Sequence, residues 1–402
     1  MKKTIKLFIL WPLYYLSGFM KRDKKIWLFG SYKNRFNDNS KYAFLRCSAS
    51  LKNIECYWIT DDEKLIKKLR LHGLKAEKRR SIRGVILMLR AGVYFVSSYA
   101  TDIMFWTSRN VYYVNLWHGM PLKEIEYDIN SGPLADKYNS KRIFDLIRYR
   151  LFEPECFKLP NLMFAPSEFW RDVISKAFRL SKDHIVLAGA PRTDILFNSM
   201  NKLYGGEFYE EGFQIESLIK DDRKKIILMP TFRDSGKDYF IESGINLQIL
   251  NDVSSKYGLV FYIKLHPSDR FSKEKENYEN VKIITDSISD IYPYLPYFDL
   301  LITDYSSIYL DYILTEKKVL FFPFDLDDYR RNSRGMYFEY NDFTPGEKVI
   351  NFDELINYIL SEFTEVNEPG TKEFINKYFD GNTHNNSDAI YKNVMLELKI
   401  KD

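Results

Sequence analysis

The chain has 402 residues, 45% of them hydrophobic, which is the size and composition of a globular protein with two or three domains. Its three cysteines show no CxxC spacing, so they argue against a disulfide framework and a structural zinc site and fit a reducing cytosol. The net charge of +4 is unevenly distributed: residues 1–158 carry 30 Lys and Arg against 15 Asp and Glu (+15), and the remainder carries 29 against 40 (−11). The basic first part predicts an anionic partner, such as a lipid leaflet, a nucleic acid or a polyphosphate chain.

Residues 1–24 are predicted to form a membrane-interface segment. An apolar stretch from Ile5 to Met20 lies between basic clusters and is shorter than the ~20 residues of a spanning helix. A secretory signal peptide is disfavoured because no A-x-A-like cleavage site follows. We expect an interfacial helix whose lysines contact anionic lipid and whose aromatic side chains lie at headgroup level: Trp11, Tyr14 and Tyr15. A core helix that is basic at both ends is the alternative.

Short apolar runs alternate with helical patterns along the rest of the chain. They predict strands at 25–30, 55–60, 93–98, 112–117, 162–167 and 184–189, and then at 225–230, 260–266, 281–285, 300–303 and 319–323. Helical patterns lie between them, for example at 62–73, 167–178 and 306–317. Continuous apolar strands alternating with helices are typical of buried parallel sheets in an α/β fold.

The number of strands and the change of charge midway favour two α/β domains over one. The polar stretch 198–225, which contains a Gly-Gly pair, is the expected linker. We predict one domain at 25–200, a second at 201–380 and a C-terminal helix at 381–402. The last segment, about 351–400, is expected to consist of helices.

Two histidines follow predicted strands in matching places of the two halves. His118 follows the run "VYYVNLW", and His266 ends "LVFYIKLH". In open α/β sheets, ligands bind at the carboxyl ends of the strands, so two such domains facing each other would bring both histidines to one cleft. A hydrogen-bonded turn histidine is the alternative for each residue alone.

Hydroxyl and cationic side chains also gather at predicted strand ends. The strand 300–303 ends at Thr303, and Ser306 and Ser307 then begin a helix, where free amides and hydroxyls can bind a phosphate. Several arginines follow other strands and suggest a di- or polyphosphate ligand: Arg192, Arg233, Arg330, Arg331 and Arg334. Ion pairs with nearby aspartates are the alternative.

Other motifs carry less weight. The chain has no P-loop, no GxGxxG and no GxSxG nucleophile elbow. The acidic run 325–328 looks like a metal site but lies in an arginine-rich loop, so we expect no metal and no cofactor. The basic amphipathic stretches 78–90 and 136–152 fit a membrane surface better than a nucleic acid, because long apolar faces accompany their arginines.

Seven motifs occur in a characteristic order: "LWHGMPLK", "APSEFW", "GAPRTDIL", "ILMPTFRD", "YIKLHP", "ITDYSSIYLDYILTEKKVLFFPFDLDDY" and "RGMYFEYNDFTPG". Together, over about residues 110–380, they resemble the CDP-glycerol glycerophosphotransferase family, which includes teichoic acid primases and polymerases. The resemblance implies a GT-B-type fold, with an acceptor-side Rossmann-like domain at 25–200 and a CDP-donor-binding one at 201–380. It also implies a bacterial enzyme of cell-wall or capsule synthesis, peripheral on the cytoplasmic face of the membrane.

By the same resemblance, the enzyme transfers glycerol phosphate, or a related alditol phosphate, from a CDP-linked donor to a lipid-linked glycan or polyol-phosphate acceptor and releases CMP. His118 would be the general base and His266 a partner of the donor phosphates. Ser306, Ser307 and Arg233 would hold the pyrophosphate. Further family positions, with less defined roles, are Asp311 and Arg334.

The chain departs from the family pattern at three positions. Met120 stands where the family often has Thr, Phe232 where it often has Trp, and Thr193 where it often has Asn. The length favours a primase or short-chain transferase. Two alternatives stay open: a GT-B glycosyltransferase that uses a nucleotide sugar, and a non-catalytic membrane protein that binds an anionic polymer.

Overall fold

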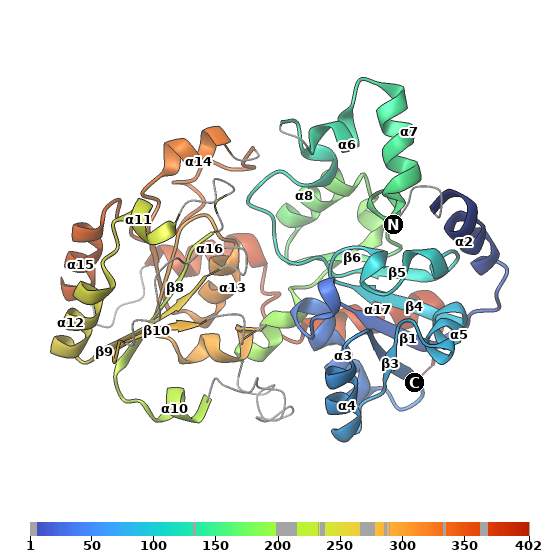
Figure 1. Cartoon of the computed structure of the whole chain (residues 1–402), viewed down its shortest axis with the longest axis horizontal. Coiled ribbons are helices and arrows are strands. Elements are labelled where there is room, and N and C mark those ends of the chain that lie inside the picture. The colour runs from blue at the N-terminus through green and yellow to red at the C-terminus, as the bar shows by residue number, and fades with distance from the viewer. Residues whose placement is uncertain are drawn as a thin grey trace.

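A computed structural model describes residues 6–131, 134–197, 215–231, 233, 238–265, 278–284, 288, 290–332, 335–361 and 369–401. Within them the chain forms two lobes, each built around a parallel five-stranded sheet (Figure 1). The blue-to-green lobe holds the first half of the sequence and the yellow-to-orange lobe the second half.

The first sheet has the order β3-β2-β1-β4-β5. Its strands are β1 (Asp23–Gly30), β2 (Glu55–Thr60), β3 (Ala76–Lys78), β4 (Ala91–Val96) and β5 (Tyr112–Asn115). The helices that connect them are α3 (Asp38–Ser50), α4 (Glu63–Leu71) and α5 (Ile82–Arg90). The Asp62 carboxylate caps α4 by accepting from two backbone N–H groups, and the Ser81 hydroxyl caps α5. The strand order reverses between β1 and β4, which is where such sheets bind ligands.

A small two-stranded sheet extends this lobe. It consists of β6 (Met163–Ala165) and β7 (Ile185–Leu187), and a bridge between Val114 and Leu162 joins it to the edge at β5. The helices of this part are α6 (Ala135–Asn139), α7 (Ile143–Phe152) and α8 (Glu168–Phe178). Figure 1 shows α7 projecting from the lobe.

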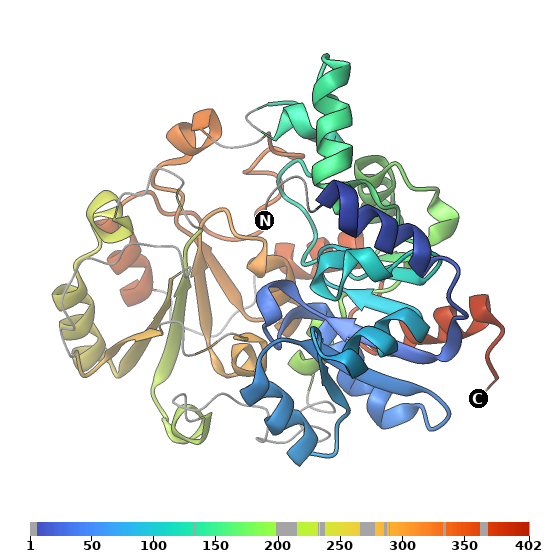
Figure 2. The same ribbon diagram turned by 45° about the vertical axis from the view of Figure 1, so that its right-hand side comes forward.

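The N-terminal segment packs against the first lobe. Lys6–Leu10 is a π-helical turn, and α2 (Trp11–Ser17) follows it. The Trp11 indole donates to the Leu151 carbonyl of α7 at 3.1 Å, and Figure 2 shows α2 beside the base of α7. Tyr14 stacks on Phe105, with ring centroids 4.8 Å apart. Trp11 and Tyr14 therefore contact protein, whereas Tyr15 is 50% exposed; the expected placement of the three aromatic side chains at headgroup level stays a prediction.

The second sheet repeats the topology of the first. Its order is β10-β9-β8-β11-β12, with strands β8 (Lys224–Met229), β9 (Leu259–Lys264), β10 (Val281–Ile284), β11 (Leu300–Thr303) and β12 (Lys318–Phe321). The helices of this lobe are α10 (Ile215–Lys220), α11 (Tyr239–Ser243), α12 (Leu247–Tyr257), α13 (Ile308–Tyr312), α14 (Leu326–Asn332) and α15 (Phe352–Ser361). Gly258 ends α12 with φ +65°, a conformation that glycine adopts without strain.

The last helices connect the lobes. After α16 (Pro369–Phe379), the chain returns to the first lobe, where α17 (Asn386–Leu398) packs against α3. An ion pair between Arg46 and Asp388, with 2.6 Å between Nε and Oδ1, joins these two helices. The Asp194 carboxylate accepts from the Asn386 and Ser387 N–H groups at the start of α17.

All eleven predicted strands are present, and their ends differ from the prediction by at most two residues. The sequence pattern missed β3, whose "AEK" is too short and polar to stand out. Most of the expected linker, 198–225, lies outside the described residues. The domain boundaries at 24, 200 and 380 stay predictions.

Candidate functional site

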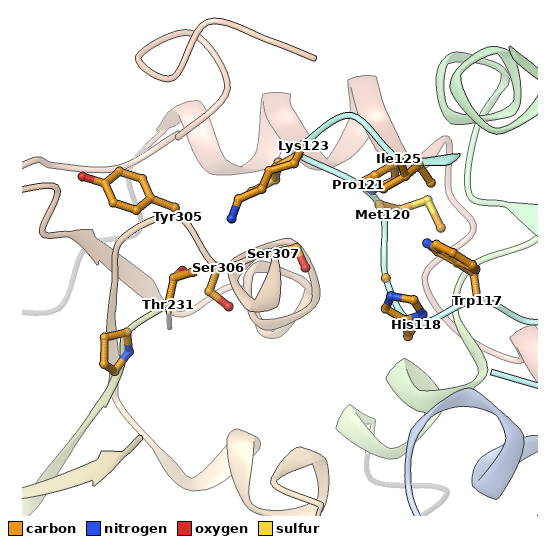
Figure 3. Close-up of a pocket in the computed structure, with 13 residues that line it drawn as sticks. Trp117, His118, Met120, Pro121, Lys123, Ile125, Thr231, Tyr305, Ser306 and Ser307 are labelled. Carbon is orange, nitrogen blue, oxygen red and sulfur yellow. The ribbon is translucent and has the colours of Figure 1, made fainter. Parts of the chain in front are cut away.

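A cavity of about 520 Å³ lies between the lobes, at the carboxyl ends of both sheets. Residues of the first lobe form one wall: Trp117, His118, Gly119, Met120, Pro121, Leu122, Lys123 and Ile125. Residues of the second lobe form the other: Pro230, Thr231, Tyr305, Ser306 and Ser307. Figure 3 shows His118 and the two serines on opposite sides of this space.

His118 is held in one tautomer. Its Nδ1 lies 3.1 Å from the carbonyl oxygen of Ser97, the residue after β4. Because a carbonyl oxygen only accepts, Nδ1 carries the proton and Nε2 is the basic nitrogen. The ring also packs on Trp117, with centroids 4.3 Å apart. His118 is thus an oriented base at the edge of the cavity.

The backbone around His118 is unusual. Trp117 has φ +45° and Gly119 has φ +142°, so the chain leaves β5 in a turn that side chains disfavour. A Cβ atom at Gly119 would lie 2.9 Å from Nη2 of Arg192 and 3.3 Å from the Ser307 hydroxyl. Glycine is therefore required here because both lobes approach the backbone closely.

Two buried asparagines hold this turn. The Asn39 amide, on α3, donates to the carbonyls of Leu116 and Trp117, both at 2.9 Å. Asn115 accepts from the Trp117 N–H at 2.9 Å and donates to the Ser98 carbonyl at 2.8 Å. These side chains satisfy backbone groups that the strand ladder no longer pairs.

Arg192 lies behind the turn rather than in the cavity wall. Its Nη1 donates to the His118 carbonyl at 2.7 Å and pairs with Asp38 at 2.8 Å. From the second lobe, Asp311 accepts from Nε at 3.1 Å and Nη2 at 2.7 Å. Burial lowers the pKa of the guanidinium, but Asp311, Tyr292 and Asp38 outweigh it and raise the pKa well above its ordinary value.

This arrangement bears on two residues that were predicted to bind substrate. Arg192 is 5% exposed, pairs with two carboxylates and donates to the His118 carbonyl, and its contact with a phosphate stays a prediction. Asp311 is engaged by Arg192 and by the Tyr292 hydroxyl, which donates at 2.5 Å. Neither belongs to the described cavity lining.

The wall from the second lobe supplies hydroxyl groups and a short helix. Ser306 and Ser307 line the cavity as predicted, and α13 follows Ser307 directly. The Ser307 hydroxyl makes no capping hydrogen bond, while the Ser306 hydroxyl accepts from the Ile308 N–H at 3.4 Å. Thr303, in contrast, donates its hydroxyl to the Met229 carbonyl at 2.7 Å and is 1% exposed, so it is structural.

Arg233 forms ion pairs with two aspartates next to this wall. It forms a two-point ion pair with Asp325, at 2.8 and 2.9 Å, and pairs with Asp304 at 2.8 Å. Burial lowers its pKa, yet Asp304 and Asp325 raise it more strongly, so the guanidinium stays charged. Arg233 thus contacts two carboxylates, one of which, Asp325, begins the acidic run, and its contact with pyrophosphate stays a prediction.

Backbone hydrogen bonds next to Lys123 join the two lobes beside the cavity. Lys123 and Met336 form an antiparallel bridge, and the Tyr337 N–H donates to the Leu122 carbonyl at 3.0 Å. Lys123 places its Nζ 4.5 Å from the centre of the Tyr329 ring and lines the cavity. The loop after His118 is thus attached to the second lobe as well as to the first.

His266 and Arg334 lie outside the described residues, so their predicted roles stay predictions. Sequence reasoning missed Lys123 and the supporting residues Asp38 and Asn39, of which only Asn39 is fully buried. Lys123 stands five residues after His118, in the "LWHGMPLK" motif, and this proximity is the signal that could have found it. No signal pointed to Asp38 and Asn39, which precede Arg192 by about 150 residues.

The cavity brings together an oriented histidine base, a lysine and two serine hydroxyls. Such a set can deprotonate a hydroxyl and stabilise charge on a phosphoryl group. Two parallel sheets of the same order, meeting over this cavity, define a GT-B-like α/β enzyme with two Rossmann-like units.

The sequence identifies the family. The chain belongs to the CDP-glycerol:poly(glycerophosphate) glycerophosphotransferase family, whose profile matches residues 13–396. The teichoic acid glycerol-phosphate transferase of Staphylococcus aureus is 27% identical over 308 residues, which cover 74% of each chain. The teichoic acid poly(glycerol phosphate) polymerase of Staphylococcus epidermidis is 28% identical over 262 residues, which are 63% of this chain but about a third (34%) of that polymerase.

The fold agrees with this membership. A structure of the wall teichoic acid polymerase TagF soaked with CDPG superposes with a TM-score of 0.76 at 21% identity and covers 99% of this chain and 96% of the other. The predicted resemblance and the predicted glycerophosphotransferase-like enzyme class are confirmed at the level of the family. Among the described helices, none is both long and apolar enough to cross a membrane.

Proposed function

We propose that the enzyme transfers glycerol phosphate, or a related alditol phosphate, from a CDP-linked donor to a hydroxyl of a lipid-linked or polymeric cell-surface glycan, releasing CMP. The observation that carries this proposal is the fixed tautomer of His118, whose Nδ1 donates to Ser97 and whose ring borders the cavity opposite Ser306 and Ser307. A neutral imidazole with a basic Nε2 is the group that proton removal from an acceptor hydroxyl needs near pH 7.

In the proposed reaction, Nε2 of His118 takes the acceptor proton while the acceptor oxygen forms a bond to the β-phosphorus of the donor. The bond between that phosphorus and the bridging oxygen breaks, and CMP leaves with the electron pair. The Lys123 ammonium and the hydroxyls of Ser306 and Ser307 stabilise the anionic phosphoryl oxygens. On the family pattern alone, His266 also contacts the donor phosphates, and Arg334 is a further substrate-binding position.

We further propose that the enzyme is peripheral on the cytoplasmic face of the membrane and binds anionic lipid. Two neighbouring parts of the first lobe expose apolar side chains. In the N-terminal segment these are Phe8, Ile9, Leu16 and Phe19, and on α7 they are Ile143, Phe144 and Ile147. Basic residues of α7 and its flank accompany them: Lys141, Arg142, Arg148 and Arg150. Exposed apolar and basic groups together favour an anionic bilayer surface.

The catalytic proposal is tested by CMP release from CDP-glycerol, CDP-ribitol and UDP-sugars, with a lipid-linked acceptor. We expect turnover of a CDP-alditol and at least a ~100-fold loss in His118→Gln. His184→Gln is the matched control, because Nδ1 of His184 also lies 3.0 Å from a backbone carbonyl, that of Asn161, but away from the cavity. Turnover of UDP-sugars alone would favour the glycosyltransferase alternative. No turnover with any donor would favour the non-catalytic one.

The membrane proposal is tested by sedimentation with vesicles of phosphatidylcholine, with and without phosphatidylglycerol. Phe144→Asp should weaken binding to anionic vesicles. Leu71→Asp on α4 is the matched control, because Leu71 and Phe144 are both 82% exposed. Equal binding of the two variants would contradict the assignment of this surface.

A further inference from the structure

The peptide group between Ser97 and Ser98 has hydrogen bonds on both of its sides. Its carbonyl, that of Ser97, accepts from Nδ1 of His118 at 3.1 Å. Its N–H, that of Ser98, donates to Oδ2 of Asp102 at 2.8 Å. One planar peptide therefore connects a carboxylate to the imidazole of His118.

Asp102 is held firmly in this place. It is 2% exposed, and its Oδ2 also accepts from the Ser97 N–H at 3.0 Å. Its Oδ1 accepts from the Ser98 hydroxyl at 2.8 Å. The local geometry suits a capping carboxylate, but an uncharged asparagine could satisfy the same two N–H groups. The hydrogen bonds of the turn therefore do not explain why this buried side chain is an ionisable carboxyl.

The surroundings of Asp102 determine when it is charged. Burial raises the pKa of Asp102 to about 7, against the hydrogen bonds from Ser98 and Ser97, which lower it, while the charge of Asp38 raises it further. Arg79 donates to the Asp102 backbone carbonyl at 2.7 Å. The charge of Asp102 also contributes to the raised pKa of the buried Tyr113. Above pH 7, Asp102 is therefore a carboxylate in a buried site.

We propose that Asp102 is a positioning residue that supports His118 through the Ser97–Ser98 peptide. A carboxylate on the N–H polarises the peptide and makes its carbonyl a stronger acceptor, because hydrogen bonds in a chain strengthen one another. The stronger acceptor fixes the tautomer of His118 and stabilises the imidazolium that forms when Nε2 takes the acceptor proton. This inference rests on the proposed role of His118 as the base.

The first test measures the titration of His118 without any substrate. The full-length protein is prepared with ¹³C-labelled histidine, and the His118 signal is the one missing from His118→Gln. In Asp102→Asn, which keeps the shape and the N–H contacts but removes the charge, the pKa of His118 should fall. An unchanged titration of His118 would overturn the proposal, whether or not His118 proves to be the catalytic base.

The second test measures turnover against pH. Asp102→Asn should lower kcat about 10-fold at pH 8, the effect of one charge-assisted hydrogen bond, and leave KM for CDP-glycerol within a factor of about two. The ratio of native to variant kcat should shrink below pH 7, because native Asp102 is then protonated. A ratio that stays constant with pH would indicate a purely structural role and contradict the proposal.

Two further variants separate the possible causes. In a His118→Gln background, Asp102→Asn should cause no additional loss, because its effect passes through His118. Asp194→Asn is the control, since Asp194 also accepts from two successive N–H groups, those of Asn386 and Ser387, and should leave the His118 titration unchanged.

If Asp102→Asn does not fold, Ser98→Ala removes only the contact to Oδ1 and should shift His118 in the same direction by less. An unchanged His118 titration in that variant would also refute the inference. If both His118→Gln and Asp102→Asn kept full activity, the proposed function would be refuted. The titration of His118 would still decide whether Asp102 acts on it.

Discussion

Asp311 accepts two hydrogen bonds from Arg192 across the boundary between the lobes, at 3.1 Å from Nε and 2.7 Å from Nη2. Both side chains are buried, and the same guanidinium donates to the carbonyl of His118 at 2.7 Å. A buried ion pair between the lobes is therefore part of the support of the proposed base.

Replacing Asp311 by Asn should destabilise the protein and slow the reaction. The substitution leaves a buried guanidinium with one carboxylate instead of two, which costs about 3 kcal/mol in the free energy of unfolding. Denaturant unfolding and kcat measure the two effects. Glu55→Gln is the control, because its pair with Lys75 is about half exposed and should change stability by less than about 1 kcal/mol. Equal effects of the two variants would contradict the role given to Arg192.

Replacing Gly119 by Ala should reduce kcat about 100-fold, the effect of displacing a catalytic group by about 1 Å. The new Cβ would lie 2.9 Å from Nη2 of Arg192 at a φ of +142°, so the turn that carries His118 must shift. Gly73→Ala is the control: Gly73 has φ +75° but nothing within 4 Å of its Cβ position. That variant should lose about 1 kcal/mol of stability and keep its activity.

Replacing Lys123 by Gln should raise KM for the CDP donor about 10-fold, because the cavity loses a cation that faces an anionic substrate. The rise should diminish at high salt, which screens the charge of the native lysine. Lys256→Gln is the matched control, since Lys256 also lies over a tyrosine ring, that of Tyr257 at 5.1 Å, but on α12 and away from the cavity. An unchanged KM in the Lys123 variant would remove this residue from the donor site.

Replacing Lys158 by Met should stabilise the protein at pH 7. Burial and the nearby charge of Arg22 lower the pKa of Lys158 to about 8, so between pH 8 and the usual pKa of 10.5 the unfolded chain binds a proton that the folded one does not. Stability thus rises with pH across this window, and the native lysine costs up to about 3 kcal/mol below it.

Unfolding of the native protein and of Lys158→Met should therefore differ at pH 7 and converge near pH 10.5. Lys141→Met is the control, because Lys141 is exposed and lies two residues before α7 begins. Its effect on stability should not vary with pH in this way. A stability difference that does not vary with pH would show that the effect of Lys158→Met is packing rather than charge.

The sequence pattern predicted the strands and the cavity wall well, because both depend on local features. Eleven apolar runs became strands, and His118, Ser306 and Ser307 follow strands that end at one cavity. The ion pairs of Arg192 and Arg233 could not be predicted from the sequence pattern, for a physical reason. A cation after a strand fits a phosphate or a carboxylate equally well, and the carboxylates of Asp311 and Asp325 come from distant segments that spacing along the chain cannot reveal.

The supports of His118 were also beyond prediction from pattern. Asn39 contacts the turn from a helix about 77 residues away, as the bond to Leu116 shows. Asp102 lies four residues after Ser98, close enough in sequence to suggest a capped turn. Nothing in that spacing indicates that the other side of the peptide holds the imidazole, because strand ends are juxtaposed only once the sheet has formed.

The return of the chain to its first lobe restricts how the enzyme can move. The two lobes are joined covalently twice, once after the segment that ends at Phe197 and once before α17 begins at Asn386. Two covalent junctions limit the relative separation of the lobes more than a single junction would. A ligand that contacts both walls of the cavity therefore binds between lobes that the chain already holds near each other.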